Sequence, residues 1–506
     1  MVEPTAVRQA IARRRQQPPP ALLVHPLQII AAWREIALHG SVTRDSSLDK
    51  SDSKALFWEW LIMISEAIGK DVAAVLVPQM TGLASAGAVS LVVTQSYLTS
   101  GDSPRVLMAR HFELLDRTIQ RPEVRDSSSW LDIESDIRRE IGCDWRTFMS
   151  IGAVLALTGL GSGCYEEKCA WALVDPDVVF AGRVDRATLD PLISQVSCDL
   201  AWLRAHFDAA GSIGAIMPDA LPLQERPLIR MPSRGYCVSM PQLVAERFTI
   251  GVYHTLFNAW RQRTGRPRNR FTTFWGNLLE AYVDSLFEAV YCPSSMLARR
   301  LWTDQDLPCT GVKPADIMLD CGATLALFEV THSHLTRKAL VCGDFDQIGK
   351  DLARVVVAKA KQLGRAIDDF RKGRFTLRGM RPQSFRRFLP IIVVWQSVPL
   401  FAPTIEYVRA RLVEEAVLQQ PHILPVQVLT ISECEGLLAA VHKGEESLLD
   451  AITDKVREER TVRESFTNYR HRIGRPLQSG HHPVVECASE RLMGQLESSF
   501  SRDFDQ

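Results

Sequence analysis

The pattern of apolar positions divides the chain into a helical first half and a mixed second half. Up to about residue 225, apolar residues recur at helical spacing, as in the series Leu56, Trp60, Met63 and Ile64. After a proline-rich stretch at 218–236, short apolar runs rich in β-branched residues alternate with helical segments. This change of rhythm predicts a domain boundary at the proline-rich stretch.

The second half follows the order helix, three strands, helix and strand, with one more strand after. This order predicts an α/β fold class, with a mixed β-sheet flanked by helices over residues 226–440. A mostly α-helical N-terminal domain is expected at 25–225, where no motif indicates a reaction and a protein partner is the expected ligand. The remaining segments are a flexible basic tail at 1–24 and a charged helical extension at 441–506.

Composition and charge bear on whether the protein binds nucleic acid or zinc. The 506 residues include 59 Lys+Arg and 59 Asp+Glu, so a nucleic acid would have to be met by a local basic patch. The 11 Cys contain no CxxC pair, which argues against zinc and fits free thiols in a reducing cytoplasm.

Two stretches without charge, 72–98 and 147–165, are long enough to cross a bilayer. The first contains Pro78 and several polar residues, and the second contains four glycines. Buried helices are the favoured interpretation, so no membrane partner is expected. A membrane-attached protein is the alternative.

The stretch "PADIMLDCGATLALFEVTHSHL" holds two apolar runs, each with a carboxylate that is out of place there, Asp316 and Glu329. A symmetric hairpin would set Met318 opposite Leu327 and Asp316 opposite Glu329, with the two acidic side chains on one face and Cβ atoms about 5 Å apart. Two buried anions so close require a cation, and Mg²⁺ is the simplest choice. The alternative is that both acids face solvent from edge strands.

A third acid, Glu280, lies at the edge of the apolar stripe of "GNLLEAYVDSLFEAVY" and can point towards the hairpin. A helix with "LLEAYV", then "PADIML", then "LFEVT" resembles the PD-(D/E)XK nuclease superfamily, which has a restriction-endonuclease-like core. The resemblance implies that Glu280, Asp316 and Glu329 bind Mg²⁺ (or Mn²⁺) and take part in phosphodiester hydrolysis. The family's lysine position is Thr331 here.

Another lysine is expected to serve in its place. On the helix predicted at 344–372, Lys359 falls within about 20° of Leu352 and therefore inside the apolar stripe, with Gln362 beside it. A lysine among core positions needs an anion, and the two hairpin acids are the nearest candidates. The resemblance permits such a relocated lysine. A side chain that reaches past the rim of the core is the alternative, and His332 and His334 are weaker catalytic candidates.

Two basic stretches flank this region and are expected to contact nucleic-acid phosphates. The first, "RQRTGRPRNR", contributes Arg266, Arg268 and Arg270, and the second, "RKGRFTLRGMRPQSFRR", contributes Arg374 and Arg378. Solvated loops are the alternative for both.

The residues together predict a Mg²⁺-dependent phosphodiesterase that acts on DNA, with RNA as an open alternative. The resemblance implies roles in restriction, repair or defence. A competing hypothesis is a catalytically inactive nuclease-like fold that serves as a scaffold for nucleic acid or protein, and Thr331 is its best support.

Overall fold

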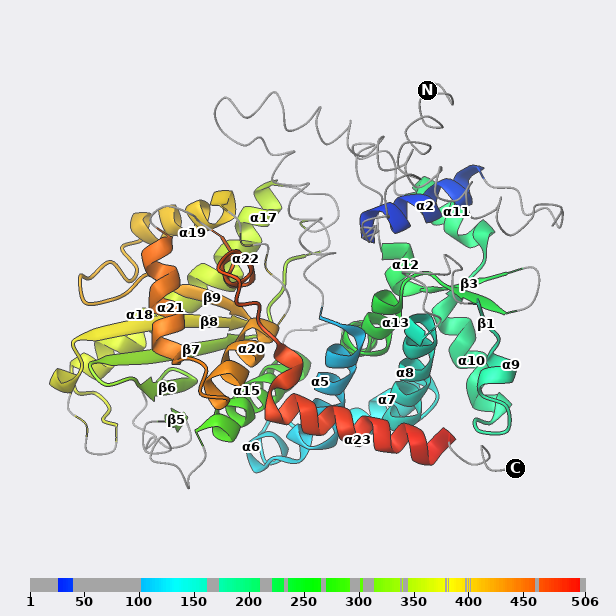
Figure 1. Cartoon of the computed structure of the whole chain (residues 1–506), viewed down its shortest axis with the longest axis horizontal. Helices are drawn as coiled ribbons and strands as arrows, with labels where there is room; N and C mark the ends of the chain where they lie inside the picture. Colours follow the sequence, from blue (N-terminus) through cyan, green and yellow to red (C-terminus); the bar gives the residue numbers. More distant parts are fainter. Residues whose placement is uncertain are drawn as a thin grey trace. The chain divides into compact units, whose positions relative to one another are not determined.

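The computed structural model divides the chain into two compact units. Unit 1 consists of Met1–Leu91 and Ile151–Gly251, and unit 2 of Val92–Ser150 and Val252–Gln506 (Figure 1). The described residues are 26–39, 102–161, 173–209, 221–231, 235–264, 270–291, 301–303, 314–336, 339, 345–377, 380, 382–395, 398, 400, 402–459 and 464–500.

Unit 1 combines helices with a small mixed sheet of order β1-β4-β3-β2. Strand β4 is antiparallel to β1 and β3, whereas β2 is parallel to β3. Its strands are β1 (Leu173–Val174), β2 (Ser197–Cys198), β3 (Leu228–Arg230) and β4 (Tyr236–Val238). Its described helices are α2 (Pro26–His39), α9 (Pro176–Val179), α10 (Arg186–Val196), α11 (Leu200–Ala209), α12 (Leu221–Glu225) and α13 (Pro241–Phe248). Strands of two or three residues are too short to produce an alternation of apolar and polar positions in the sequence. The pattern of apolar residues in this region therefore predicts only helices.

Unit 2 is built on a five-stranded mixed sheet of order β5-β6-β7-β8-β9. The strands are β5 (Leu301–Thr303), β6 (Ile317–Asp320), β7 (Thr324–Thr331), β8 (Arg387–Val394) and β9 (Gln427–Thr430). The pairs β5–β6 and β6–β7 are antiparallel, and β7–β8 and β8–β9 are parallel. The expected α/β class with a mixed sheet is therefore confirmed.

The hairpin of β6 and β7 has the predicted register. Met318 pairs with Leu327, and Ile317 pairs with Phe328. The turn closes with a 2.9 Å hydrogen bond from Cys321 N to Thr324 O, and Gly322 adopts a φ of +82° that favours glycine. A one-residue slip would have turned every side chain to the other face.

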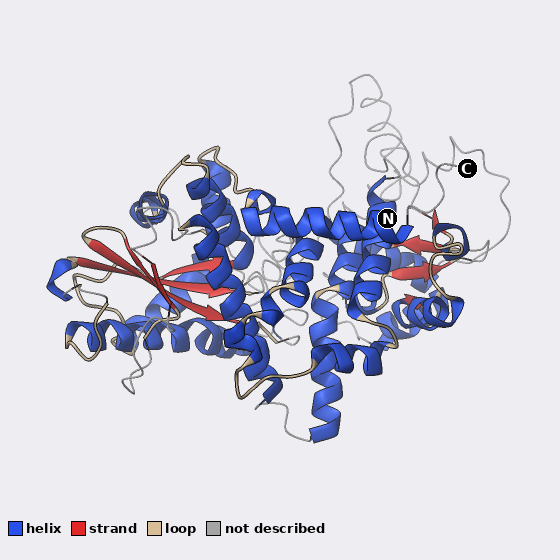
Figure 2. Ribbon diagram, turned by 90° about the horizontal axis from the view of Figure 1, so that it is seen from below, coloured by secondary structure: helices blue, strands red, loops and turns tan. Residues whose placement is uncertain are grey.

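Helices cover both faces of this sheet (Figure 2). On one face, Phe287 of α15 (Arg270–Val290) packs against Phe328, with ring centroids 4.8 Å apart. On the other face, Lys359 of α18 (Ala358–Arg371) bonds to Glu329. Because neighbours on a strand point to opposite sides, these contacts assign α15 and α18 to opposite faces.

The helix predicted at 344–372 contains an irregularity. It consists of α17 (Phe345–Leu352), a π-helical turn η5 (Ala353–Val357) and α18. Each turn of a π-helix takes up one residue more than an α-helical turn. The pattern of apolar residues is that of an uninterrupted α-helix, so the sequence does not predict this turn.

N-terminal and C-terminal segments meet in unit 2. Helix α5 (Pro104–Asp116) packs on α23 (Pro483–Phe500) through Ala109, Val485 and Ala488. The structural division therefore differs from the expected boundary near residue 225, because α5 packs with residues far along the chain. The described residues of the extension expected at 441–506 are mostly helical, and α23 packs on α5. The other described helices of unit 2 are η2 (Thr118–Gln120), α6 (Pro122–Arg125), α7 (Ile133–Ile141), η6 (Pro382–Ser384), α19 (Ala402–Glu414), α20 (Ile431–His442), α21 (Leu448–Glu458), α22 (Phe466–Arg472) and η7 (Ser479–His481). Helices α8 (Trp145–Gly161) and α14 (Ile250–Thr264) each contain a division between the units.

The two uncharged stretches have different outcomes. Residues 72–98 lie outside the described part of the chain, as does the tail expected at 1–24. Residues 147–165 fall largely on α8. None of the described helices has the length and apolar character that a bilayer crossing requires.

Candidate functional site

The centre of the candidate site is an ion pair between β7 and α18. Lys359 Nζ donates a hydrogen bond to Glu329 Oε2 at 2.8 Å. The Glu329 side chain is 1% exposed and that of Lys359 is 17% exposed, so the pair meets solvent through the lysine. The predicted proximity of these two residues is therefore found in the structure.

Asp316 joins this pair at the end of the hairpin. It precedes β6 by one residue, and the register puts it opposite Glu329. Its Oδ2 atom accepts a hydrogen bond from Val330 N at 2.8 Å, and the residue is 4% exposed. The two acids are thus buried beside each other and do not face solvent from an edge strand.

Glu280 lies on the opposite face of the sheet. A Cβ atom on Gly276 would lie 3.3 Å from Nδ1 of His332, and Phe287 touches Phe328, so these two residues mark the side of α15 that faces β7. Glu280 is about 40° round the helix from Gly276, on that same side. It therefore approaches the sheet from the face that Glu329 turns away from.

The expected set of three metal ligands, Glu280, Asp316 and Glu329, stays a prediction. Within the described ranges, no group of three or more His, Cys, Asp or Glu side chains is arranged to hold a metal ion. Asp316 and Glu329 adjoin, and Glu280 is carried by α15, which packs on the other face of the sheet. Two carboxylates still fit Mg²⁺, which often takes only one or two from protein and completes its shell with water and phosphate oxygens.

Thr331, at the family's lysine position, has a local structural role. Its Oγ1 atom accepts a hydrogen bond from Ser333 N at 3.1 Å, just beyond the end of β7. Gln362, one turn after Lys359 on α18, has its Oε1 atom buried without a donor among the described residues. The ammonium group that contacts Glu329 is that of Lys359.

Two histidines follow β7. Burial, together with the nearby charges of His334, Lys359 and Arg354, lowers the pKa of His332 to about 4. Burial also lowers the pKa of His334. Both rings are therefore uncharged at neutral pH, so neither contributes positive charge to the site.

Of the five arginines predicted to bind phosphate, the structure describes Arg270 and Arg374. Arg266, Arg268 and Arg378 lie outside the described residues. Arg270 begins α15 at the end that contacts His332, and its Nη2 atom donates to the carbonyl of Trp130 at 2.7 Å. It is therefore on the same end of the sheet as Glu329.

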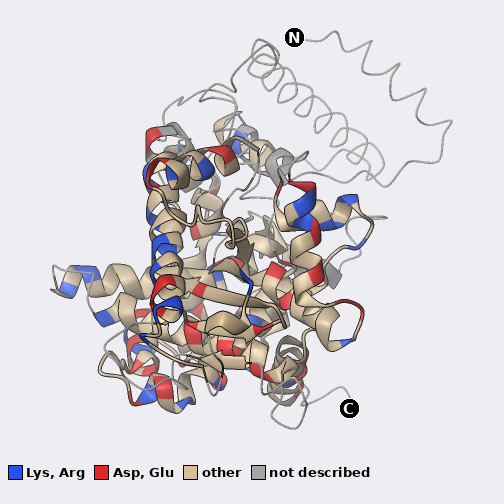
Figure 3. Ribbon diagram, turned by 90° about the vertical axis from the view of Figure 1, so that its left-hand side faces the viewer, with Lys and Arg blue, Asp and Glu red and all other residues tan. Residues whose placement is uncertain are grey.

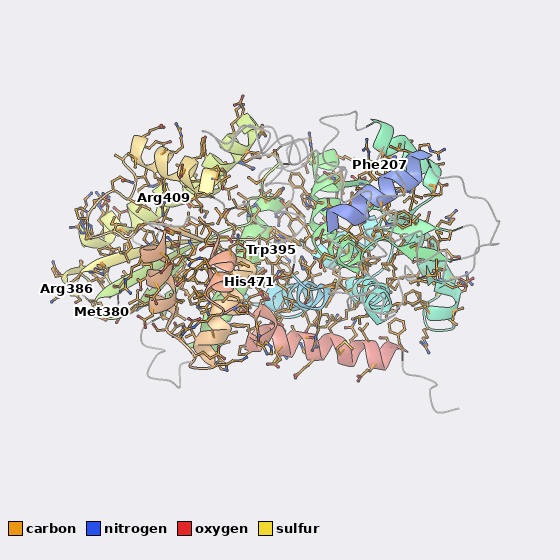
Figure 4. The ribbon with its side chains drawn as sticks, turned by 45° about the horizontal axis from the view of Figure 1, so that its top comes forward. Phe207, Met380, Arg386, Trp395, Arg409 and His471 are labelled. Carbon is orange, nitrogen blue, oxygen red and sulfur yellow. The ribbon has the colours of Figure 1, made fainter. Side chains whose placement is uncertain are left out.

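Arg374 lies at the other end of the sheet. The twelve residues of α18 that separate Lys359 from Arg371 span about 18 Å, and Arg374 follows them. Arg374 pairs with Asp369 at 2.8 Å. Figure 4 labels Arg386, next to β8 at this end, far from Trp395, which follows the strand at its other end. Figure 3 shows Lys and Arg interspersed with Asp and Glu along the ribbon.

A buried carboxylate near the site escaped the sequence analysis. Asp351, in α17, is 2% exposed and accepts hydrogen bonds from Thr336, Gln347 and Arg354. The sequence could have indicated Asp351 through its spacing, because it lies four residues after Gln347 and three before Arg354. Side chains at these spacings lie next to each other on a helix and can form hydrogen bonds.

Comparisons with protein-family models, with curated proteins and with solved structures found no match for this chain.

Proposed function

We propose that unit 2 is a metal-dependent phosphodiesterase that acts on nucleic acid, with DNA as the first substrate to test. The observation that carries this proposal is the 2.8 Å contact between Lys359 Nζ and Glu329 Oε2 beside Asp316. Two acids and a lysine at one strand end are the groups that phosphodiester hydrolysis with a divalent cation requires.

The order of elements supports the resemblance to the PD-(D/E)XK superfamily. An antiparallel hairpin leads into β7, a helical crossover follows, and β8 returns parallel to β7. The lysine comes from that crossover helix instead of from β7. A restriction-endonuclease-like core is therefore part of the proposal, and Lys359 is its relocated lysine.

Each residue has a defined task in the proposed reaction. Asp316 and Glu329 would hold Mg²⁺ or Mn²⁺, which supplies positive charge at the scissile phosphate and lowers the pKa of a water. Lys359 reaches solvent and would orient the attacking water and stabilise charge on the phosphate. Arg270 and its neighbours Arg266 and Arg268 would contact the nucleic-acid backbone.

Purified protein, plasmid DNA and Mg²⁺ or Mn²⁺ provide the test. We expect Asp316→Asn to lower the cleavage rate by about 100-fold or more, because it removes a carboxylate from the cation site. Asp320→Asn is the matched control, since Asp320 lies on the same strand but bonds to Gly322 N in the turn. Equal rates in the two variants, or no cleavage by the wild type, would contradict the proposal.

An inactive scaffold is the second candidate. It is favoured by Thr331 at the lysine position and by the burial of Glu329 against Lys359. This alternative predicts nucleic-acid binding that is unchanged by Asp316→Asn and is not accompanied by cleavage with either metal. RNA oligonucleotides in the same assay distinguish the two kinds of nucleic acid.

A further inference from the structure

The loop that follows β7 is fastened to α17 through Asp351. Asp351 Oδ2 accepts hydrogen bonds from both Thr336 N and Thr336 Oγ1, each at 2.7 Å. Its other oxygen accepts from Gln347 Nε2 at 3.1 Å and from Arg354 Nη2 at 3.0 Å. A carboxylate that is buried and bonded this fully fixes its partners in place.

Arg354 extends the same fastening to a second point of the loop. Its Nη2 atom also donates to the carbonyl of His334 at 2.7 Å. The loop is therefore held at His334 and at Thr336 by residues at one end of the π-helical turn. At the other end of that turn, Lys359 is held to Glu329 in β7.

The π-helical turn aligns these two attachments. In an uninterrupted α-helix, Asp351 and Lys359 would point about 80° apart, since they are eight residues apart at 100° per residue. One extra residue in the turn reduces that difference to about 20°. Asp351 and Lys359 can then both face β7 and the loop that continues it.

From this geometry we infer that Asp351, with Thr336 and Arg354, is a positioning element that directs Lys359 towards Glu329 across the π-helical turn. This inference deepens the proposed function and rests on it only for the chemical role of Lys359. Releasing the loop would let the turn relax to α-helical geometry and rotate Lys359 out of line with Glu329.

Competitive acetylation of the full-length protein with limiting acetic anhydride tests the positioning directly. Lys361 is an internal reference in the same helix, because its side chain is 48% exposed, against 17% for Lys359. We expect Asp351→Asn and the milder Thr336→Val to raise the acetylation of Lys359 relative to Lys361 by up to about threefold, the ratio of those exposures.

Glu433→Gln is the matched control. Glu433 is also buried, and its Oε1 atom accepts hydrogen bonds from Thr467 N and Thr467 Oγ1 at 2.6 and 2.8 Å, away from β7. We expect the ratio of Lys359 to Lys361 acetylation to be unchanged in this variant. An unchanged ratio in both loop variants, or an equal rise at both lysines, would overturn the inference.

Kinetics separate this inference from the proposed function. If the wild type cleaves DNA, Thr336→Val should lower kcat and leave KM unchanged, because it misdirects Lys359 and does not remove a contact with substrate. A rise in KM alone would count against positioning. If the wild type cleaves nothing, the acetylation ratio still decides whether Asp351 positions Lys359.

Discussion

Two of the buried ion pairs in unit 2 differ in their access to solvent. Arg110 and Glu435 are 3% and 0% exposed and share hydrogen bonds with Ser432 and Tyr282. Lys359 and Glu329 are 17% and 1% exposed. The first pair is sealed within the fold, whereas the lysine of the second meets solvent, so only the second can respond to a ligand.

The electrostatics of the sealed pair fit a structural role. Burial alone would lower the pKa of Arg110, but the charges of Asp102 and Glu435 outweigh burial and raise the pKa. The guanidinium therefore stays charged and joins α5 to α20. A buried pair of this kind maintains a specific arrangement and is costly to break.

The largest expected effect comes from breaking the sealed pair. Arg110→Met leaves Glu435 buried beside Tyr282 without its cationic partner, which should cost about 3–5 kcal/mol of unfolding free energy. Urea denaturation at neutral pH measures it. A loss below 1 kcal/mol would mean that the pair is not sealed in solution.

Acid should also lower the stability of the protein through a histidine beside each pair, by less than the Arg110→Met substitution does. Burial lowers the pKa of His111, beside the sealed pair, to about 3 and that of His332, beside the open pair, to about 4. The folded state therefore keeps both rings neutral while the unfolded state binds protons below its pKa of about 6.5. Stability should be complete above pH 6.5 and fall as the pH decreases towards 4, by about 2 kcal/mol per histidine at pH 5.

Two substitutions assign this effect to its region. His111→Phe and His332→Phe should each reduce the difference in Tm between pH 7 and pH 5, measured by circular dichroism. The same pH dependence in the wild type and in both variants would contradict the assignment.

Breaking the open pair should cost less than breaking the sealed one. Lys359→Met should lower the unfolding free energy by about 1–2 kcal/mol, because Glu329 loses a charged hydrogen bond from a lysine that is partly exposed to solvent. Added Mg²⁺ should restore part of this loss in Lys359→Met and none of it in Arg110→Met. Thermal denaturation with and without Mg²⁺ provides the comparison.

The smallest effect is expected at the far end of the sheet. Arg374 already pairs with Asp369, and about 18 Å of helix separate its segment from Lys359. We expect Arg374→Ala to change DNA affinity by no more than about twofold at 150 mM salt. A larger loss, measured by fluorescence anisotropy, would show that nucleic acid reaches this end.

Some of the candidate site could be predicted because it depends on local geometry. The alternation of side chains along a hairpin sets Asp316 opposite Glu329, and this argument needs only neighbouring residues. Lys359 does contact Glu329, but the regular 100° step from Leu352 does not explain why, because the π-helical turn lies between Leu352 and Lys359. The catalytic role of these side chains stays a prediction.

Other features depend on contacts that a single sequence does not reveal. The position of Glu280 on α15 does not state which side of the sheet this helix covers. The contacts of α5 include the bond from Arg110 to Glu435, 325 residues further along the chain. The π-helical turn is set by two attachments at once, and the apolar pattern alone fits a regular helix.

The central claim is that the open pair of Lys359 and Glu329 serves a hydrolytic reaction. The most direct test is the rate of Mg²⁺-dependent plasmid cleavage by the wild type, Lys359→Met and Lys361→Met under identical conditions. We predict a loss of about 100-fold or more for Lys359→Met, and little change for Lys361→Met, whose lysine pairs with Glu415 instead. Cleavage by Lys359→Met at the wild-type rate would contradict the account.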